Sequence, residues 1–135
     1  MKYRNIEQYK YQLMADEKFE TGILGYSFKT PFIELDPEGI MTLKDGYLSD
    51  GASGPTHDDE ENMRAAFGHD GLYELMRRGL LPIEIKDTAD RLLHKWMLEA
   101  GASEVRANYY YDAVHNFAWH TCIAGTETKD IILEV

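Results

Sequence analysis

The residues of this sequence best suited to chemistry are a histidine, an aspartate and a tyrosine close together in one predicted helix. His69 is followed directly by Asp70, and Tyr73 comes four residues after His69, so the imidazole and the phenol share one helical face. A histidine held by a carboxylate acts as a general base. A carboxylate beside loop carbonyls is a ligand set for a hard cation. The pattern therefore favours a histidine base next to a hard-cation site.

Two other segments contribute residues to this candidate site. Asp90 lies in the first turn of the next predicted helix, and we expect its carboxylate within hydrogen-bond reach of the histidine. Upstream, the glycine-rich loop 49–57 contains Asp50, Gly51 and Gly54. Such a loop can present carbonyl oxygens to a cation, and Asp50 raises the local concentration of cations. The candidate metal residues are Asp70, Asp50, Gly51 and Gly54.

Each of these residues also has an ordinary structural explanation. Asp70 could lie at the surface while His69 is a hydrogen-bonded core imidazole, which is the commoner situation for an isolated His-Asp pair. The stretch Asp87–Asp90 resembles a capping arrangement, in which Asp90 bonds back to the backbone of its own helix. The sequence alone leaves both explanations open beside the functional one.

The other histidines offer weaker signals. His57 and His94 occupy ordinary polar positions, for which no role is expected. His115 and His120 are five residues apart, which is the wrong spacing for a two-histidine helical metal motif. Asp112 and His115 are three residues apart and could form a pair of structural rather than catalytic kind.

The elements that must position the candidate site change in character along the chain. Up to about residue 48, apolar and polar residues alternate, with turn signals at 36–39 and 44–46, which predicts four or five short antiparallel strands over 9–48. After the loop 49–57 the apolar period becomes 3.6, which predicts helices over 58–79, 87–100 and 103–124. The expected fold is α+β, with a small antiparallel N-terminal sheet followed by three packed α-helices in a single domain of 135 residues.

Caps and apolar faces define these predicted helices. The first should begin near Asp58 or Asp59 and end at Gly79, the second should be capped by Asp87, and the third by Ser103. The faces expected to be buried are Met63, Ala66, Phe67, His69, Tyr73 and Met76 in the first helix, Ala89, Leu92, Leu93, Trp96, Met97 and Ala100 in the second, and Val105, Tyr109, Ala113, Val114, Phe117 and Cys122 in the third.

The charge balance narrows the classes of partner. Fourteen basic and twenty-four acidic residues give a formal charge of −10. Between Glu34 and Asn62 there are nine acidic residues, and Lys44 is the single base. Nucleic-acid binders need clustered Lys and Arg, and anionic membranes attract the same residues, so neither partner is expected. An acidic segment next to the loop suits a cation.

Cysteine content and hydropathy point to an intracellular setting. Cys122 is the single cysteine, which excludes an internal disulfide framework and a cysteine zinc site. No run approaches the roughly 20 apolar residues of a membrane span. The first residues lack the apolar core of a signal peptide, so we expect a protein without a transmembrane segment or signal peptide.

Five segments together resemble a known family. They are Gly46–Thr56, Ala65–Tyr73, Ala89–Leu93, Arg106–Ala107 and Tyr111–Phe117. In this order and spacing they are similar to the phage and prophage family called domain of unknown function 1353, although His115 stands where that family usually has an arginine. The resemblance implies a phage gene product, located in the host cytoplasm or the virion, whose partners are virion or host-envelope components. It implies no activity.

A shorter stretch resembles the catalytic layout of secreted phospholipase A2. There a glycine-rich calcium loop precedes a His-Asp-x-x-Tyr helix, and a distant Asp-Arg pair opens another helical stretch; here the helix matches at His69, Asp70 and Tyr73 and the pair at Asp90 and Arg91. The resemblance implies that His69 activates water, that Asp90 orients His69, and that Asp70 and the loop hold calcium. The calcium would stabilise the oxyanion of an ester or amide.

Two hypotheses from different classes follow. The first is a calcium-assisted hydrolase that uses His69, Asp90 and Tyr73 on an ester or amide of an envelope component. The second is a non-catalytic phage accessory or virion protein, in which the same residues form a buried polar network. A minor alternative is an acidic inhibitor that mimics DNA, for which the charge is too concentrated in one segment.

Overall fold

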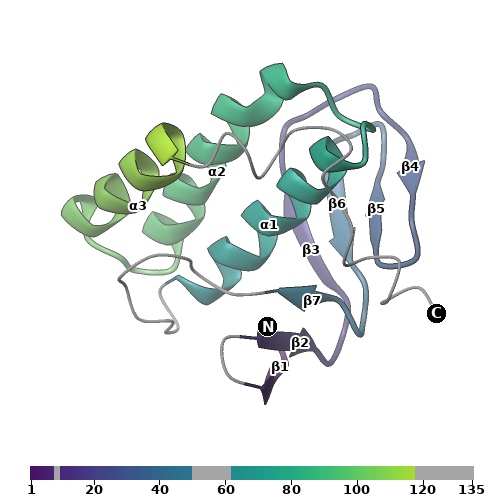
Figure 1. Cartoon of the computed structure of the whole chain (residues 1–135), viewed down its shortest axis with the longest axis horizontal. Coiled ribbons are helices and arrows are strands. Elements are labelled where there is room, and N and C mark those ends of the chain that lie inside the picture. Colours follow the sequence, from purple (N-terminus) through teal and green to yellow (C-terminus); the bar gives the residue numbers. More distant parts are fainter. Residues whose placement is uncertain (8–9, 50–61, 118–135) are drawn as a thin grey trace. The chain divides into compact units, whose positions relative to one another are not determined.

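A computed structural model describes residues 1–7, 10–49 and 62–117 of the chain (Figure 1). Contacts between residues divide the chain into two compact units, residues 1–53 and 54–135. The division falls inside the segment 49–57 that the sequence predicts as a loop. Strands lie in the first unit and helices in the second, which confirms the α+β class. That the two units make one domain stays a prediction.

The first unit contains seven short strands in two antiparallel sheets. The strands are β1 (Tyr3–Glu7), β2 (Lys10–Leu13), β3 (Glu17–Glu20), β4 (Phe28–Lys29), β5 (Ile33–Leu35), β6 (Ile40–Leu43) and β7 (Leu48–Ser49). One sheet has the order β1-β2-β7 and the other the order β3-β6-β5-β4. The sequence predicts one sheet that begins at residue 9. Strand β1 is not predicted, because Tyr3–Glu7 is mostly polar and lacks clear alternation.

Alternation and turn chemistry explain the four-stranded sheet. Phe19, which pairs with Met41 across β3 and β6, is fully buried, whereas its strand neighbours are exposed. Between β5 and β6, the Asp36 carboxylate accepts hydrogen bonds from the backbone N–H of Glu38 and Ile40, each at 3.0 Å. Gly39 completes this turn at φ +87°, and a Cβ there would lie 3.2 Å from backbone nitrogens. The turn predicted at 36–39 is therefore confirmed, and glycine is required in it.

The second unit contains three α-helices and one short 3₁₀ helix. They are α1 (Met63–Arg77), η1 (Ile83–Ile85), α2 (Lys86–Glu99) and α3 (Glu104–Phe117). In the chain, α2 lies between the other two helices, and it contacts both of them (Figure 1). None of the helices in the described ranges is both long and apolar enough to cross a membrane.

Several predicted helix ends are confirmed. Gly79 and Gly101 follow α1 and α2 with φ of +75° and +101°, the left-handed conformation that commonly ends a helix. Ser103 caps α3, because its hydroxyl oxygen accepts a hydrogen bond from the backbone N–H of Arg106 at 3.1 Å. The start predicted near Asp58 and the end predicted at 124 lie outside the described residues.

The predicted cap of the second helix is wrong. The N-cap residue of α2 is Ile85, and no side chain caps this end. Asp87 lies in the first turn, where its carboxylate accepts hydrogen bonds from Arg91 at 2.7 Å and Tyr111 at 2.9 Å. The preceding 3₁₀ helix runs directly into α2, so the helical backbone begins before the residue that sequence marks as a cap.

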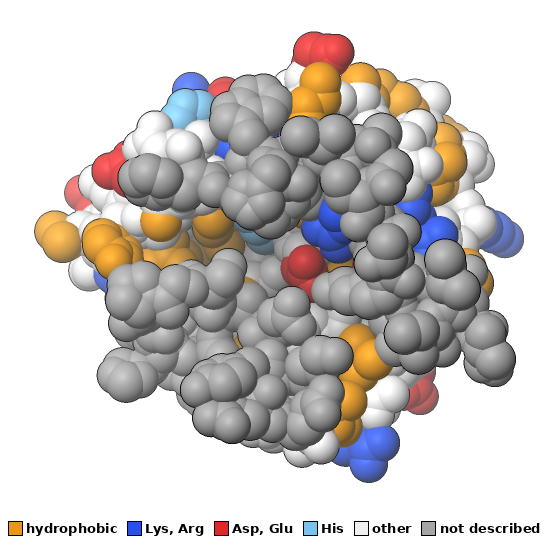
Figure 2. Space-filling model, in the orientation of Figure 1, with side chains coloured by type: hydrophobic (Ala, Val, Ile, Leu, Met, Phe, Trp, Pro, Cys, Tyr) orange, Lys and Arg blue, Asp and Glu red, His pale blue; other side chains and the backbone are white. Residues whose placement is uncertain are grey.

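The predicted apolar face of the third helix is also wrong in its first turns. Val105 is 80% exposed and Tyr109 is 49% exposed, whereas Ala107 and Tyr110 are buried. Figure 2 shows hydrophobic side chains on the surface of α3. Hydropathy patterns favour bulky residues, but the buried residue here is the small Ala107. Ala100, expected to be buried at the end of α2, is exposed.

Candidate functional site

The candidate site is built around the carboxylate of Asp90, which is completely buried within the second unit. Its Oδ1 accepts hydrogen bonds from His69 Nε2 at 2.8 Å and from the Tyr73 hydroxyl at 2.6 Å. Its Oδ2 accepts a hydrogen bond from Lys86 Nζ at 2.8 Å. Three donors around one buried carboxylate are the arrangement that keeps a charge stable away from water.

Two helices supply these four side chains at the same spacing. His69 and Tyr73 lie one turn apart on α1, and Lys86 and Asp90 lie one turn apart at the start of α2. The hydrogen bond expected between His69 and Asp90 is therefore present. The capping alternative for Asp90 is not what the structure shows, since its carboxylate is bonded to side chains of α1 and to Lys86.

The hydrogen bonds determine the charge of Asp90. Burial acts to raise the pKa of Asp90, but the three hydrogen bonds together outweigh burial and hold the pKa below its ordinary value. Asp90 is therefore an anion at neutral pH, and an ionised carboxylate can only accept hydrogen bonds. Nε2 of His69 must therefore be protonated, and it donates this proton in the hydrogen bond to Asp90.

This protonation leaves the second ring nitrogen of His69 as the basic one. In a neutral imidazole with its proton on Nε2, the lone pair is on Nδ1. No residue of the described ranges forms a hydrogen bond with that nitrogen. The His69 side chain is 10% exposed, and the Tyr73 ring packs against it with 4.1 Å between centroids. The ring is thus fixed at one end and has an acceptor at the other.

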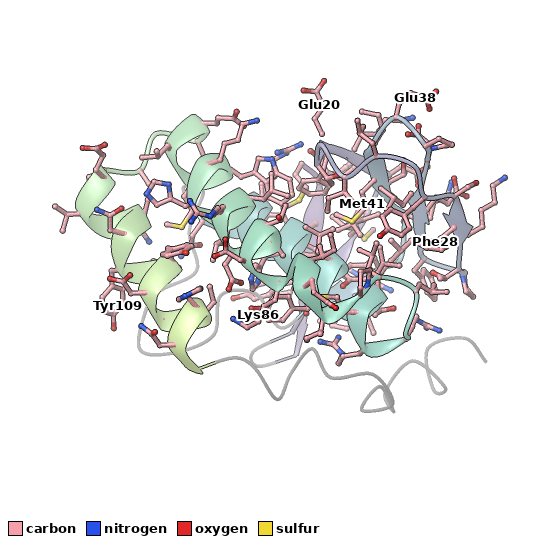
Figure 3. The ribbon with its side chains drawn as sticks, turned by 90° about the horizontal axis from the view of Figure 1, so that it is seen from above. Glu20, Phe28, Glu38, Met41, Lys86 and Tyr109 are labelled. Carbon is pink, nitrogen blue, oxygen red and sulfur yellow. The ribbon has the colours of Figure 1, made fainter. Side chains whose placement is uncertain are left out.

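Lys86 is a member of the cluster that was not predicted from the sequence. The Lys86 side chain is buried, and its ammonium donates to Asp90, to the Val114 carbonyl at 3.0 Å and to the His115 carbonyl at 3.2 Å. Figure 3 labels Lys86 among the side chains of this unit. Two signals could have found it: its position four residues before Asp90, and a cation at a helix N-terminus, where the helix dipole disfavours positive charge.

A second, more exposed polar group lies beside this centre. His115 Nδ1 is 3.5 Å from Asp87 Oδ1 and 3.8 Å from Asp90 Oδ2, and its ring stacks on Tyr111 at 5.1 Å. Hydrogen bonds from Arg91 and Tyr111 lower the pKa of Asp87. The partner expected for His115 was Asp112, but the structure places His115 against Asp87 of the neighbouring helix.

The structure describes only part of the predicted metal site. Asp70 is on α1 directly after His69, and its side chain is partly exposed. Asp50, Gly51 and Gly54 lie outside the described residues. Within residues 1–7, 10–49 and 62–117, no group of three or more His, Cys, Asp or Glu side chains is placed to hold a metal ion.

Of the three remaining histidines, His94 lies in the part of the chain that the structure describes. His94 Nε2 lies 2.7 Å from Asn108 Oδ1, a contact between α2 and α3. His94 thus has a structural contact where no role was expected. His57 and His120 lie outside the described residues.

Comparisons with known proteins give no relative for this arrangement. No protein-family model matches the chain, and no curated protein or solved structure matches it.

Proposed function

We propose that this chain is a small hydrolase in which His69 is the general base and Asp90 orients it. The observation that carries the proposal is the buried hydrogen bond between His69 Nε2 and the Asp90 carboxylate, at 2.8 Å. It fixes the ring and, by holding the proton on Nε2, leaves Nδ1 as the base. Tyr73 supports both partners, through its hydroxyl on Asp90 and its ring on His69.

The reaction that suits this geometry is the hydrolysis of an ester or amide. His69 Nδ1 takes a proton from a water molecule while the water oxygen attacks the carbonyl carbon. The ring is then an imidazolium, and the anionic Asp90 stabilises it. When the tetrahedral intermediate collapses, the bond to the leaving group breaks and the proton moves from Nδ1 to that group. The products are a carboxylic acid and an alcohol or amine, and His69 returns to its starting form.

Calcium is part of this proposal through Asp70. A partly exposed carboxylate next to the base is a suitable hard ligand, and the other predicted ligands, Asp50, Gly51 and Gly54, lie outside the described residues. A bound calcium ion would stabilise negative charge on the carbonyl oxygen. The proton transfer itself is carried out by His69.

Calcium binding is tested by thermal melting. We expect millimolar calcium to raise the melting temperature of the wild-type protein, because a ligand that binds only the folded state stabilises it. The D70N variant should lose this shift, since it lacks the carboxylate charge. D112N, which changes an exposed aspartate on α3, is the matched control and should keep the shift. No shift in wild type at millimolar calcium would remove calcium from the proposal.

The substrate class follows from the acidic composition and from the family resemblance. A formal charge of −10 disfavours an anionic lipid surface, so we propose an uncharged ester or amide of an envelope component, met by a phage-encoded protein during infection or lysis. The implied locations are the host cytoplasm and the virion.

One observation favours a second candidate function. Asp90 is completely buried and both of its carboxylate oxygens accept hydrogen bonds, as in a polar network that only stabilises a fold. In that case the chain would be a non-catalytic phage accessory or virion protein, and His69 would contribute to stability alone.

Ester hydrolysis by wild type and H69Q separates the two candidates. We would assay a panel of uncharged aryl esters and amides with and without calcium, and measure the free energy of unfolding of both proteins by urea denaturation. The hydrolase account expects the H69Q rate to fall at least about 100-fold, because the base is gone, while the fold persists. H94Q changes a partly exposed histidine of α2 that is not bonded to Asp90, and it should keep the wild-type rate.

The structural candidate predicts a different pattern. No hydrolysis by wild type above the uncatalysed rate on any substrate, together with a large loss of stability in H69Q, would contradict the hydrolase proposal and favour a purely structural network.

A further inference from the structure

Two tyrosine–histidine pairs contact aspartates of α2. The pair on α1 contacts Asp90, and the pair on α3 consists of Tyr111 and His115, which lie one turn apart. The Tyr111 hydroxyl donates to Asp87 at 2.9 Å, and its ring stacks on His115 with 5.1 Å between centroids. In both pairs, therefore, the tyrosine hydroxyl holds an aspartate of α2 while its ring packs against the histidine. The pair on α3 has no part in the proposed hydrolysis.

The contacts of His115 determine which of its ring nitrogens carries the proton. Its Nδ1 faces three oxygen atoms: Asp87 Oδ1 and the Tyr111 hydroxyl at 3.5 Å each, and Asp90 Oδ2 at 3.8 Å. Both carboxyl groups have a lowered pKa, so as anions they only accept hydrogen bonds, and the Tyr111 proton is already donated to Asp87. Nδ1 is therefore protonated. In the neutral ring the lone pair is then on Nε2, the reverse of the assignment at His69.

Exposure separates the two histidines. The side chain of His115 is 45% exposed, whereas that of His69 is 10% exposed. In the described part of the chain, no residue forms a hydrogen bond with Nε2 of His115. The Asp87 carboxylate beside it is fixed from both oxygens, since Oδ1 accepts from Tyr111 and Oδ2 accepts from Arg91 at 2.7 Å. His115 is thus an oriented imidazole on a surface that reagents can reach.

An accessible imidazole that is held by a carboxylate on one nitrogen and has a lone pair on the other is a nucleophile. We propose that His115 is a second reactive histidine, which accepts an uncharged acyl group on Nε2 from an activated ester. The surrounding charge selects this group: Asp87 and Asp90 are 3.5 Å and 3.8 Å from Nδ1, so an anionic phosphoryl group would be repelled. The inference goes beyond the proposed function and needs neither His69 nor calcium.

The transfer is a substitution at the carbonyl carbon of the ester. The Nε2 lone pair attacks this carbon, and a nitrogen–carbon bond forms. The bond from the carbon to the alcohol oxygen breaks, and the alcohol leaves as its anion with the electron pair. The acylated ring then loses the Nδ1 proton to the Asp87 carboxylate, and water carries this proton to the departed anion. The products are N-acyl-His115 and an alcohol.

Diethyl pyrocarbonate, an uncharged acyl donor, tests the reactivity of His115. The protein is treated with it and quenched at intervals, and tandem mass spectrometry of tryptic peptides gives the rate at each histidine. We expect His115 to react faster than His94, whose Nε2 lies 2.7 Å from Asn108. The rates are compared on the alkaline plateau of the rate–pH profile, so that they report nucleophilicity and not protonation.

D87N tests the role of the carboxylate. It removes the charge beside Nδ1, and we expect the rate at His115 to fall by at least about threefold. The matched control is D112N, which changes an exposed aspartate on the same helix as His115 and should leave the rate unchanged. The rate at His94, which lies at a contact between α2 and α3, reports whether these helices stay packed in each variant.

Equal rates at His115 in wild type and in folded D87N would overturn the proposal, as would a fall of the same size in D112N. Should D87N fail to fold, R91Q decides instead. Arg91 is 71% exposed, so its loss costs little stability, and without its guanidinium the Asp87 charge is less neutralised. The rate at His115 should then rise, and a rate no higher than in wild type would overturn the proposal.

The proposed hydrolase and this inference fail independently. Acylation of His115 should proceed in H69Q at the wild-type rate. If it does, and wild type hydrolyses no substrate, the reactive His115 stands and the proposed function falls. If hydrolysis depends on His69 but His115 reacts no faster than His94, the proposed function stands and the reactive His115 falls.

Discussion

At the scale of single residues, the central feature is a buried charge with a complete set of partners. An unpaired carboxylate in a protein interior is costly, and at Asp90 three donors offset that cost. The donors differ in kind: a phenol, an imidazole and an ammonium. The imidazole has a second ring nitrogen that can accept a proton, which is why the cluster is a candidate for chemistry as well as for stability.

Removal of the Tyr73 hydroxyl separates its two contributions. Y73F keeps the ring against His69 and loses the 2.6 Å hydrogen bond to Asp90. We expect the free energy of unfolding to fall by about 1.5–3 kcal/mol, the usual value of a hydrogen bond to a charged group, as measured by urea denaturation. Y109F, at an exposed position of α3, should change it by less than about 0.5 kcal/mol. Equal effects of the two substitutions would refute this assignment.

Sequence reasoning could find three of the four residues in this cluster. His69 and Tyr73 share a helical face, and Asp90 is a carboxylate among apolar neighbours, so each stands out in the sequence. Lys86 has weaker signals, namely its spacing of four residues from Asp90 and its place at a helix start, and a lysine there is usually a surface residue. What makes it special is its burial against the end of α3, and that depends on tertiary packing.

At the scale of elements, turns and helix ends are predicted well and packing faces less well. Glycines at 39, 79 and 101 occupy left-handed positions, which the sequence signals because other residues avoid that conformation. The division of the strands into two sheets could not be predicted, since it depends on which short strands pair. The buried side of α3 was misassigned because small Ala107 is buried and the bulkier Val105 is exposed.

The buried face of α3 can be tested by placing a lysine at position 105 and, in a second variant, at position 107. V105K should leave the free energy of unfolding within about 0.5 kcal/mol of wild type, because the side chain is 80% exposed. A107K should cost more than about 3 kcal/mol, because the ammonium would enter a packed interface without a partner. Urea denaturation of both variants gives the comparison. A larger loss in V105K than in A107K would restore the face that the hydropathy pattern indicates.

At the scale of the whole molecule, both units contain aspartates whose pKa is lowered, which favours the charged form of the carboxylate. In the first unit, the backbone N–H of Asp45 and the ammonium of Lys44 lower the pKa of Asp16. In the second, the pKa values of Asp87 and Asp90 are lowered by their hydrogen bonds. The net charge of the chain is −10, and its acidic segment was predicted to suit a cation. Residues 50–61 of that segment lie outside the described residues.

These shifts give stability a defined pH dependence. A carboxyl whose pKa is lower when folded stabilises the native state above its ordinary pKa of 3.8, and this contribution is lost as the pH falls through the lowered value. The urea midpoint should therefore decline from about pH 5 towards pH 2. D90N should show a shallower decline than wild type, because its side chain cannot take up a proton. A decline of equal steepness in D90N would show that Asp90 has the same pKa folded and unfolded.

The proposed function depends most on which ring nitrogen of His69 carries the proton. ¹⁵N NMR of the His69 ring at neutral pH identifies that nitrogen. The hydrogen bond to Asp90 requires a proton on Nε2 of His69, and the proposed base is the ring whose lone pair is on Nδ1. We predict the nitrogen shifts of this tautomer in wild type, and their loss or mixing in D90L, where the acceptor is gone. A ring protonated on Nδ1 in the wild-type protein would leave His69 without a base at its open end and would contradict the account.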